Sequence, residues 1–138
     1  MKPKNVSIVR LREALSCSWS KDTAYLGVSE ENNPSLGNCY PTSRVVQFYF
    51  PNTEIVEGRV LTPAGEEKHF WNMIVVDGVE YHVDLTWQQF PPNSRVISYK
   101  IRDRNFFNDG EDATRRVELL KERVHDFLAR EQRSHSQE

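Results

Sequence analysis

Cysteine is scarce in this chain: Cys17 and Cys39 are the two cysteines among 138 residues. Two cysteines cannot build the disulfide framework of a small secreted protein, and no CxxC pair indicates a structural zinc site. A run of apolar residues long enough to cross a bilayer is missing too, and the first residues lead into a helical pattern rather than a signal peptide. We therefore expect a cytoplasmic protein without a metal or a cofactor.

Charge of one sign is not in excess either. The 18 basic and 20 acidic residues give a net charge of −2, and the basic residues are scattered along the chain. This pattern argues against nucleic acid and membrane surfaces as partners, and it leaves the oligomeric state open. Hydrophobic residues make up 38% of the chain, enough for a core. Length and composition predict a single domain over residues 1–138, ordered over about 5–130 and followed by a polar tail.

Three segments carry the periodicity of amphipathic helices. The first covers residues 5–16, and a long polar loop over residues 20–36 follows it. The second begins at Asn38, a good N-cap residue, has Pro41 in its first turn and ends before Pro51. The third comes after a polar segment near the C-terminus. The apolar positions of the three segments are Ile8, Leu11 and Leu15; Val46, Tyr49 and Phe50; and Val117, Leu120, Val124 and Phe127.

Between the second and third helices the pattern changes to that of β-strands. Runs rich in β-forming residues cover residues 53–62, 68–76, 79–86 and 96–101. Asp77-Gly78 separates two of these runs, and such a pair is a strong signal for a two-residue hairpin turn. The sequence therefore predicts an α+β fold, in which N-terminal helices pack on an antiparallel β-sheet and a C-terminal helix follows.

The expected turn fixes the register of this hairpin. Val76 comes opposite Val79, so Trp71 comes opposite Asp84. Because side chains alternate between the faces, His69 and Asp84 share one face as diagonal neighbours, roughly 7–8 Å apart at the backbone. The other face is nearly all apolar and is expected to pack the core; it carries Phe70, Asn72, Ile74, Val76, Val79, Tyr81, Val83 and Leu85.

A cysteine at the start of a helix completes this arrangement. The positive end of the helix dipole at Cys39 favours an anion, and a neighbouring imidazolium favours the thiolate form. Asp84 would fix the tautomer of His69 and stabilise its imidazolium, and the backbone N–H of Cys39 would serve as an oxyanion donor. The residues thus predict a catalytic Cys-His-Asp triad.

Three motifs of this sequence, in the same order, resemble those of the YunG-like family of small bacterial proteins. The motifs are Ser35-Leu36-Gly37-Asn38-Cys39-Tyr40-Pro41-Thr42-Ser43, then His69-Phe70-Trp71-Asn72, then Val83-Asp84-Leu85-Thr86-Trp87-Gln88-Gln89-Phe90. The resemblance spans residues 11–124 and implies a small protein of a family without a settled activity.

More remotely, the order of cysteine, histidine and aspartate resembles the transglutaminase-like and arylamine N-acetyltransferase branches of the papain-like superfamily. That resemblance implies a papain-like, transglutaminase-like core. It assigns Cys39 as nucleophile, His69 as general base and then acid, and Asp84 as the group that orients the imidazole. This chain is much smaller than those enzymes and lacks their extra domains, so their substrates do not carry over.

Further residues are weaker candidates for the site. Trp71, opposite Asp84, is expected to shield the bond between imidazole and carboxylate from water. The side-chain amides of Asn33, Gln88 and Gln89 are candidate oxyanion donors, although loop hydrogen bonds are their commoner use. Two aromatic residues, Trp19 and Tyr40, are candidates for lining a cleft, although core packing is the usual role.

The predicted function is acyl transfer through a Cys39 thioester, on a peptide bond, a glutamine amide or an acyl donor. Several alternatives stay open. His82 shares the face of His69 and competes for the role of base. Cys39 could instead be a buried structural cysteine, or it could bind zinc with His69, His82 and Asp84. The chain could also be a papain-like binding module without catalysis, or a redox protein in which Cys17 resolves an oxidised Cys39.

Overall fold

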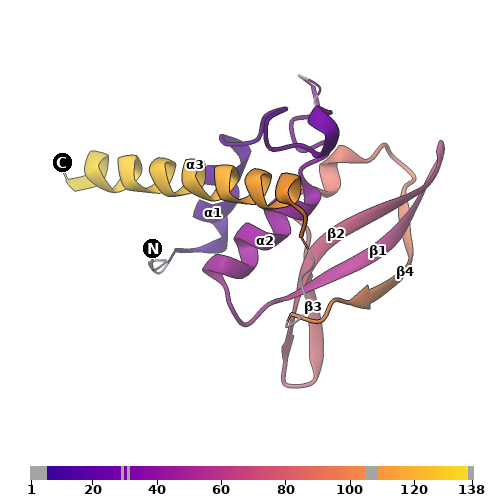
Figure 1. The fold of residues 1–138 in the computed structure, drawn as a ribbon. Coiled ribbons are helices and arrows are strands. Elements are labelled where there is room, and N and C mark those ends of the chain that lie inside the picture. Colours follow the sequence, from indigo (N-terminus) through magenta and orange to yellow (C-terminus); the bar gives the residue numbers. More distant parts are fainter. Residues whose placement is uncertain (1–5, 29, 31, 105–108, 137–138) are drawn as a thin grey trace.

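A computed structural model describes residues 6–28, 30, 32–104 and 109–136 of this protein. Three α-helices lie on one side and a four-stranded sheet on the other (Figure 1). The helices are α1 (Ile8–Ser16), α2 (Cys39–Tyr49) and α3 (Glu111–Ser136), and the strands are β1 (Glu54–Thr62), β2 (Gly65–Val76), β3 (Val79–Val83) and β4 (Arg95–Ile101). Two short 3₁₀ helices, η1 (Tyr25–Gly27) and η2 (Trp87–Gln89), lie in the connections. The fold is α+β, as the sequence predicts.

The sheet is antiparallel, with the strand order β3-β2-β1-β4. The β2–β3 hairpin has the predicted register, with Val76 opposite Val79 and Asn72 opposite Val83. Its turn residues, Asp77 and Gly78, both have positive φ angles, as a two-residue type I′ turn requires. Strand β3 ends at Val83, earlier than the sequence pattern suggests, and the following segment turns away through η2.

The sheet curls so that its two edges meet on the concave face. Tyr99 of β4 donates a hydrogen bond of 3.3 Å to Glu80 of β3, and its ring centroid lies 5.2 Å from that of His82. Gly58, in the middle of β1, permits this curl because the indole of Trp71 lies directly against it. A Cβ at position 58 would stand 2.2 Å from an indole carbon.

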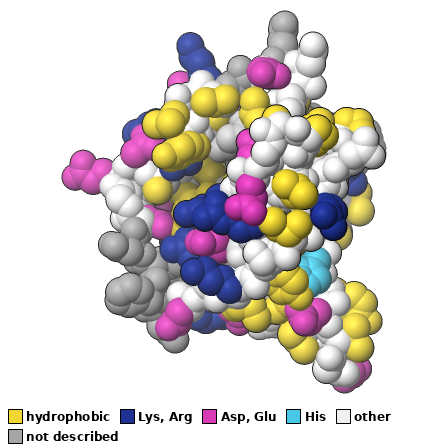
Figure 2. All heavy atoms as spheres, turned by 90° about the vertical axis from the view of Figure 1, so that its right-hand side faces the viewer, with side chains coloured by type: hydrophobic (Ala, Val, Ile, Leu, Met, Phe, Trp, Pro, Cys, Tyr) yellow, Lys and Arg dark blue, Asp and Glu magenta, His cyan; other side chains and the backbone are white. Residues whose placement is uncertain are grey.

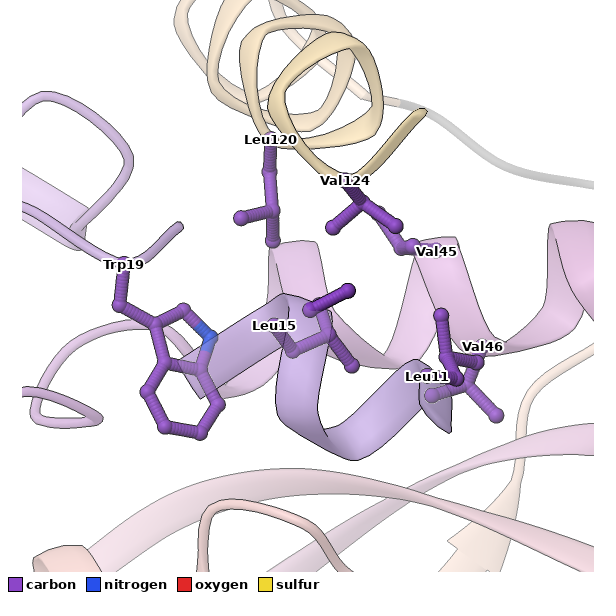
Figure 3. Close-up of a cluster of buried hydrophobic side chains, with 8 residues drawn as sticks. Leu11, Leu15, Trp19, Val45, Val46, Leu120 and Val124 are labelled. Carbon is purple, nitrogen blue, oxygen red and sulfur yellow. The ribbon is translucent and has the colours of Figure 1, made fainter. Parts of the chain in front are cut away.

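The described residues form two hydrophobic clusters. The larger one lies among the three helices and consists of Leu11, Ala14, Leu15, Trp19, Val45, Val46, Leu120 and Val124 (Figure 3). The smaller one, Val56, Trp71 and Met73, lies on the concave side of the sheet. Asn72 joins helices to sheet, since its side chain donates a hydrogen bond of 3.0 Å to the Ser43 carbonyl of α2.

The expectation that one apolar hairpin face packs the core is wrong at the hairpin tip. Val76, Val79 and Tyr81 are about half exposed, whereas His69 and Trp71 of the opposite face are buried. The reason lies in the arrangement of the elements: the tip extends past the helices (Figure 1). On the other face, the rings of Trp87 and Phe90 pack on His69, and the Trp71 indole lies against Gly58.

Helix α3 continues to Ser136, past residue 130, where the sequence pattern places the start of a polar tail. Among the described residues, no helix combines the length and apolar character needed to cross a membrane.

Candidate cysteine–histidine–aspartate site

The hairpin register brings His69 and Asp84 together. The Nε2 atom of His69 lies 2.7 Å from the Oδ2 atom of Asp84, although 15 residues separate the two in sequence. Asp84 follows the last residue of β3, so its carboxylate reaches diagonally along the sheet to the His69 ring. The His69 side chain has no exposed surface, whereas 18% of the Asp84 side chain remains exposed.

Asp84 is held by its own turn. Its Oδ1 atom accepts hydrogen bonds from the backbone N–H of Thr86, at 3.2 Å, and from the Thr86 hydroxyl, at 3.4 Å. This is the local pattern of an aspartate that caps a turn two residues ahead. One carboxylate oxygen is therefore fixed by the turn, and the other is directed at the imidazole.

Aromatic rings surround His69. Phe90 stands edge to face at a centroid distance of 4.7 Å, Trp71 lies at 5.6 Å, and Trp87 at 6.1 Å. These rings exclude water from the imidazole and strengthen its interaction with the carboxylate. Trp71 thus lies where the sequence analysis expects a shield, and two of the three rings come from the segment after Asp84.

Cys39 is the first residue of α2, and its side chain is partly buried. Burial lowers the pKa of His69, but the hydrogen bond to Asp84, a contact with the Cys39 thiol and the charges of both groups outweigh it and raise the pKa to about 9. Because Nε2 is bonded to Asp84, Nδ1 is the ring nitrogen that could interact with the Cys39 sulfur. This buried atom forms no regular hydrogen bond with any described residue.

The loop before α2 positions Cys39, and Asn38 organises this loop. The fully buried Asn38 side chain accepts a hydrogen bond of 2.6 Å from the Thr23 hydroxyl and donates to the carbonyls of Pro34 and Leu36. Asn38 occupies the N-cap position, but its side chain does not cap the helix as the sequence suggests. The buried loop supplies nearer partners, so the amide fixes the approach to Cys39 instead of the helix end.

Helix α3 supports the same loop from outside. The Arg123 guanidinium donates to the Ser18 carbonyl at 3.2 Å and to the Ser20 hydroxyl at 2.7 Å. Thr23 then connects this segment with Asn38. The position of Cys39 therefore depends on contacts between residues more than 100 positions apart in the sequence.

His82 is separate from the His69–Asp84 pair. Its Nδ1 atom accepts a hydrogen bond of 2.8 Å from Trp71 Nε1, and its Nε2 atom lies 3.4 Å from the Glu80 carboxylate. The ring of His69, not that of His82, is therefore bonded to Asp84. Within the described part of the chain, no group of three or more histidine, cysteine, aspartate or glutamate residues is placed to hold a metal ion.

The three amide residues considered as oxyanion donors instead bind backbone carbonyls. Asn33 donates to the Gln89 carbonyl at 2.8 Å and so ties the loop before α2 to the segment after Asp84. Gln88 donates to the Leu85 carbonyl and Gln89 to the Thr86 carbonyl, which stabilises the η2 turn. Each amide N–H named here is thus used for loop geometry.

The two candidate cleft aromatics have structural contacts. Trp19 belongs to the helical hydrophobic cluster, and its Nε1 atom donates to the Thr42 hydroxyl at 2.8 Å (Figure 3). Tyr40 packs edge to face on Phe70 and donates to Asp109, whose segment precedes α3. Burial, followed by this hydrogen bond and the charge of Asp109, raises the pKa of Tyr40 to about 12.

A pocket of about 380 Å³ opens beside Asp84 on the concave face of the sheet. Its lining residues are Trp71, His82, Asp84, Trp87, Arg95, Val96 and Tyr99. The sheet side of the protein exposes hydrophobic side chains next to a group of basic ones (Figure 2). The contribution of β4 is not visible in the sequence, because alternation along one strand does not reveal that a curled sheet brings that strand to the opposite edge.

A protein-family model described as "YunG protein" matches residues 7–129. The chain belongs to the YunG family. Comparisons with curated proteins and with solved structures each found no match. The range matched by the YunG model includes Cys39, His69 and Asp84 together with the aromatic residues around them, so the whole candidate site lies within the family's domain.

Proposed function

We propose that this YunG-family protein catalyses acyl transfer through a thioester on Cys39. The observation that carries the proposal is the position of His69: its fully buried imidazole is bonded to Asp84, and Cys39 lies near enough to raise the pKa of the ring. A nucleophile, a base and a group that orients the base are the three parts that such chemistry needs.

The charge state of the pair favours nucleophilic attack. Because the pKa of His69 is about 9, the imidazole carries a proton at neutral pH. The imidazolium and the N-terminal end of α2 both supply positive charge near the attacking sulfur. Asp84 balances the positive charge while the ring is protonated.

The reaction follows from these positions. The Cys39 thiolate attacks the substrate carbonyl carbon, and His69 gives its proton to the leaving amine or alcohol as the carbon–heteroatom bond breaks. A thioester results. Water or another acceptor, deprotonated by His69, then attacks the thioester and releases Cys39. The N–H of Cys39 lies in the first turn, where backbone donors have no carbonyl partner within the helix, and is the proposed donor to the oxyanion.

The order of these residues supports a papain-like, transglutaminase-like core as part of the same proposal. The nucleophile begins a helix, the histidine lies on a strand, and the aspartate directly follows the adjacent strand. This support is an analogy at the level of the fold, and it does not identify the substrate. A peptide bond, a glutamine side-chain amide and a small acyl donor all fit the chemistry.

The test is alkylation by iodoacetamide near pH 6, followed by intact-mass and peptide analysis. Cys17 is exposed and lies after the end of α1 instead of at the start of a helix, so it is an internal reference. We expect Cys39 to react at least tenfold faster than Cys17, and His69→Ala to remove this difference, whereas His82→Ala retains it. Equal and slow labelling of both cysteines would overturn the proposal.

The second candidate is a binding module with the same fold. It is favoured by the pocket beside Asp84, since Cys39 is not among the residues that line this pocket. A protein that binds a ligand there but shows no accelerated alkylation of Cys39 would support this class.

A further inference from the structure

The pocket on the concave face has the composition of a site for a ring. Trp71, Trp87 and Tyr99 contribute aromatic side chains to its lining, and Val96 adds an aliphatic one. Aromatic rings bind other planar rings through stacking and edge-to-face contacts, each of which adds to the gain from burial. The volume of about 380 Å³ is in the range of small-molecule sites.

Two of the walls are fixed before any ligand binds. The Trp71 indole lies against Gly58 and donates a hydrogen bond to His82, so it has little freedom to rotate. Tyr99 stands at 60° to this indole, at a centroid distance of 6.0 Å, and its hydroxyl donates to Glu80. A ligand would therefore meet a formed site, and little conformational entropy would be lost in these side chains on binding.

The pocket surface itself is almost wholly apolar, and the charged side chains around it favour an anion. The Asp84 carboxylate is paired with the imidazole of His69, and Glu80, which accepts a hydrogen bond from the Tyr99 hydroxyl, is not among the lining residues. Arg95, at the start of β4, also lines the pocket, and no ion pair joins its guanidinium to another residue in the described ranges. Among the lining residues, the charge left without an ion-pair partner is thus positive. A guanidinium binds carboxylates through paired hydrogen bonds.

We infer that this pocket binds a planar aromatic ring that carries a negative charge, such as an aryl carboxylate. The ring contacts the side chains of Trp71, Trp87 and Tyr99, and the anionic group faces Arg95. The inference does not rest on the proposed acyl transfer, because none of these residues is the nucleophile or the base.

Isothermal titration calorimetry with three probes tests the chemistry. The probes are 2-naphthoate, the aliphatic anion cyclohexanecarboxylate and the aromatic cation 2-naphthylmethylamine. We expect 2-naphthoate to bind at least tenfold more tightly than either of the others. Equal binding of the aliphatic anion would exclude the aromatic contacts, and equal or tighter binding of the cation would exclude the role of Arg95.

Variants locate the binding. Arg95→Gln should weaken 2-naphthoate binding about tenfold, as expected for a hydrogen bond to a charged group. Arg59→Gln, an exposed position on the neighbouring strand that does not line the pocket, should bind like the wild type. Tyr99→Ala should also weaken binding, with folding checked by circular dichroism. If neither pocket variant differs from Arg59→Gln, the assignment is wrong.

Cys39→Ala separates this inference from the proposed function. The variant lacks the nucleophile but keeps every residue of the pocket, so it should bind 2-naphthoate with unchanged affinity. If Cys39→Ala binds 2-naphthoate normally and the wild type shows no accelerated alkylation of Cys39, the pocket assignment is supported and the proposed acyl transfer is not. Loss of binding in Cys39→Ala would contradict it.

Discussion

A buried histidine that carries a proton is the central feature at the scale of single residues. Burial alone favours the neutral ring, and a buried charge without a partner is costly. In this protein Asp84 offsets that cost through a short hydrogen bond, and the turn at Thr86 prevents the carboxylate from rotating away. The pKa of about 9 is the net result of burial, which lowers it, and of Asp84 and Cys39, which raise it.

Stability should therefore depend on pH through His69. The pKa in the folded protein, about 9, lies above the ordinary 6.5, so the folded state binds the proton more tightly than the unfolded chain. The stabilisation, on the order of 3 kcal/mol, is fully present below about pH 6.5 and is lost as the pH rises through 9. Urea unfolding between pH 6 and pH 10 should show this loss, and His69→Gln should reduce the slope. Parallel pH profiles of the two proteins would contradict the account.

Asp84→Asn should lower the pKa of His69. The substitution removes the carboxylate charge and its charge-assisted hydrogen bond but keeps the size of the side chain. Burial is then opposed by Cys39 alone, so the pKa should fall well below the wild-type value of about 9, which NMR titration of the His69 ring protons measures. Glu80→Gln is the control, because it removes a carboxylate next to His82 instead of His69. This variant should leave the pKa of His69 unchanged.

At the scale of elements, residues outside α2 hold the start of this helix in place. Asn38 joins the loop over residues 34–38 to Thr23, and Arg123 of α3 holds the segment that carries Thr23. The sequence predicts a helix with Cys39 in its first turn, and the structure adds what fixes that turn relative to the sheet.

Asn38→Ala should destabilise the protein and misplace Cys39. The fully buried amide makes three hydrogen bonds, and its removal leaves the Thr23 hydroxyl and two carbonyls without this partner. We expect a loss of about 1–3 kcal/mol in the free energy of unfolding, together with slower alkylation of Cys39. Ser94→Ala removes one exposed hydrogen bond to the Pro91 carbonyl and should change neither quantity. Alkylation at the wild-type rate in Asn38→Ala would show that the loop does not position the thiol.

The curl of the sheet should depend on Gly58. An alanine there would place its Cβ 2.2 Å from an indole carbon of Trp71, and the indole cannot move without losing its hydrogen bond to His82. Overpacking of this kind costs about 1–3 kcal/mol, and the pocket walls should shift with the indole. Gly110→Ala is the matched control, because nothing lies within 4 Å of a Cβ at that position. Thermal unfolding of both variants, with near-UV circular dichroism of the tryptophans, tests the prediction.

At the scale of the whole molecule, one hydrophobic cluster stabilises the packing of the helices, and a separate one lies next to the candidate site. The helical cluster joins α1, α2 and α3 (Figure 3), and the sheet cluster shares Trp71 with the lining of the pocket. The candidate triad lies between them, with its nucleophile on α2 and its histidine on β2.

Leu120→Ala should therefore lower stability without changing the chemistry of the folded protein. Leu120 is fully buried in the helical cluster, and such truncations cost about 2–5 kcal/mol. Val9→Ala, at an exposed position of α1, should cost less than about 0.5 kcal/mol. Urea unfolding measures both, and the alkylation rate of Cys39 at low temperature should match the wild type in both. A slower rate in folded Leu120→Ala would show that the helical cluster also sets the site.

The sequence by itself determined the features that depend on short separations along the chain. The Asp77-Gly78 turn set the hairpin register, alternation then placed His69 on the same face as Asp84, and the periodicity after Asn38 placed Cys39 at a helix start. Only the tertiary structure decided which hairpin face is buried, what the Asn38 side chain binds, and that β4 closes a pocket with β3. The physical reason is that local periodicity fixes the direction of a side chain but not its surroundings. Those depend on the curl around Gly58 and on how far the helices reach over the sheet, and both result from contacts between segments distant in sequence.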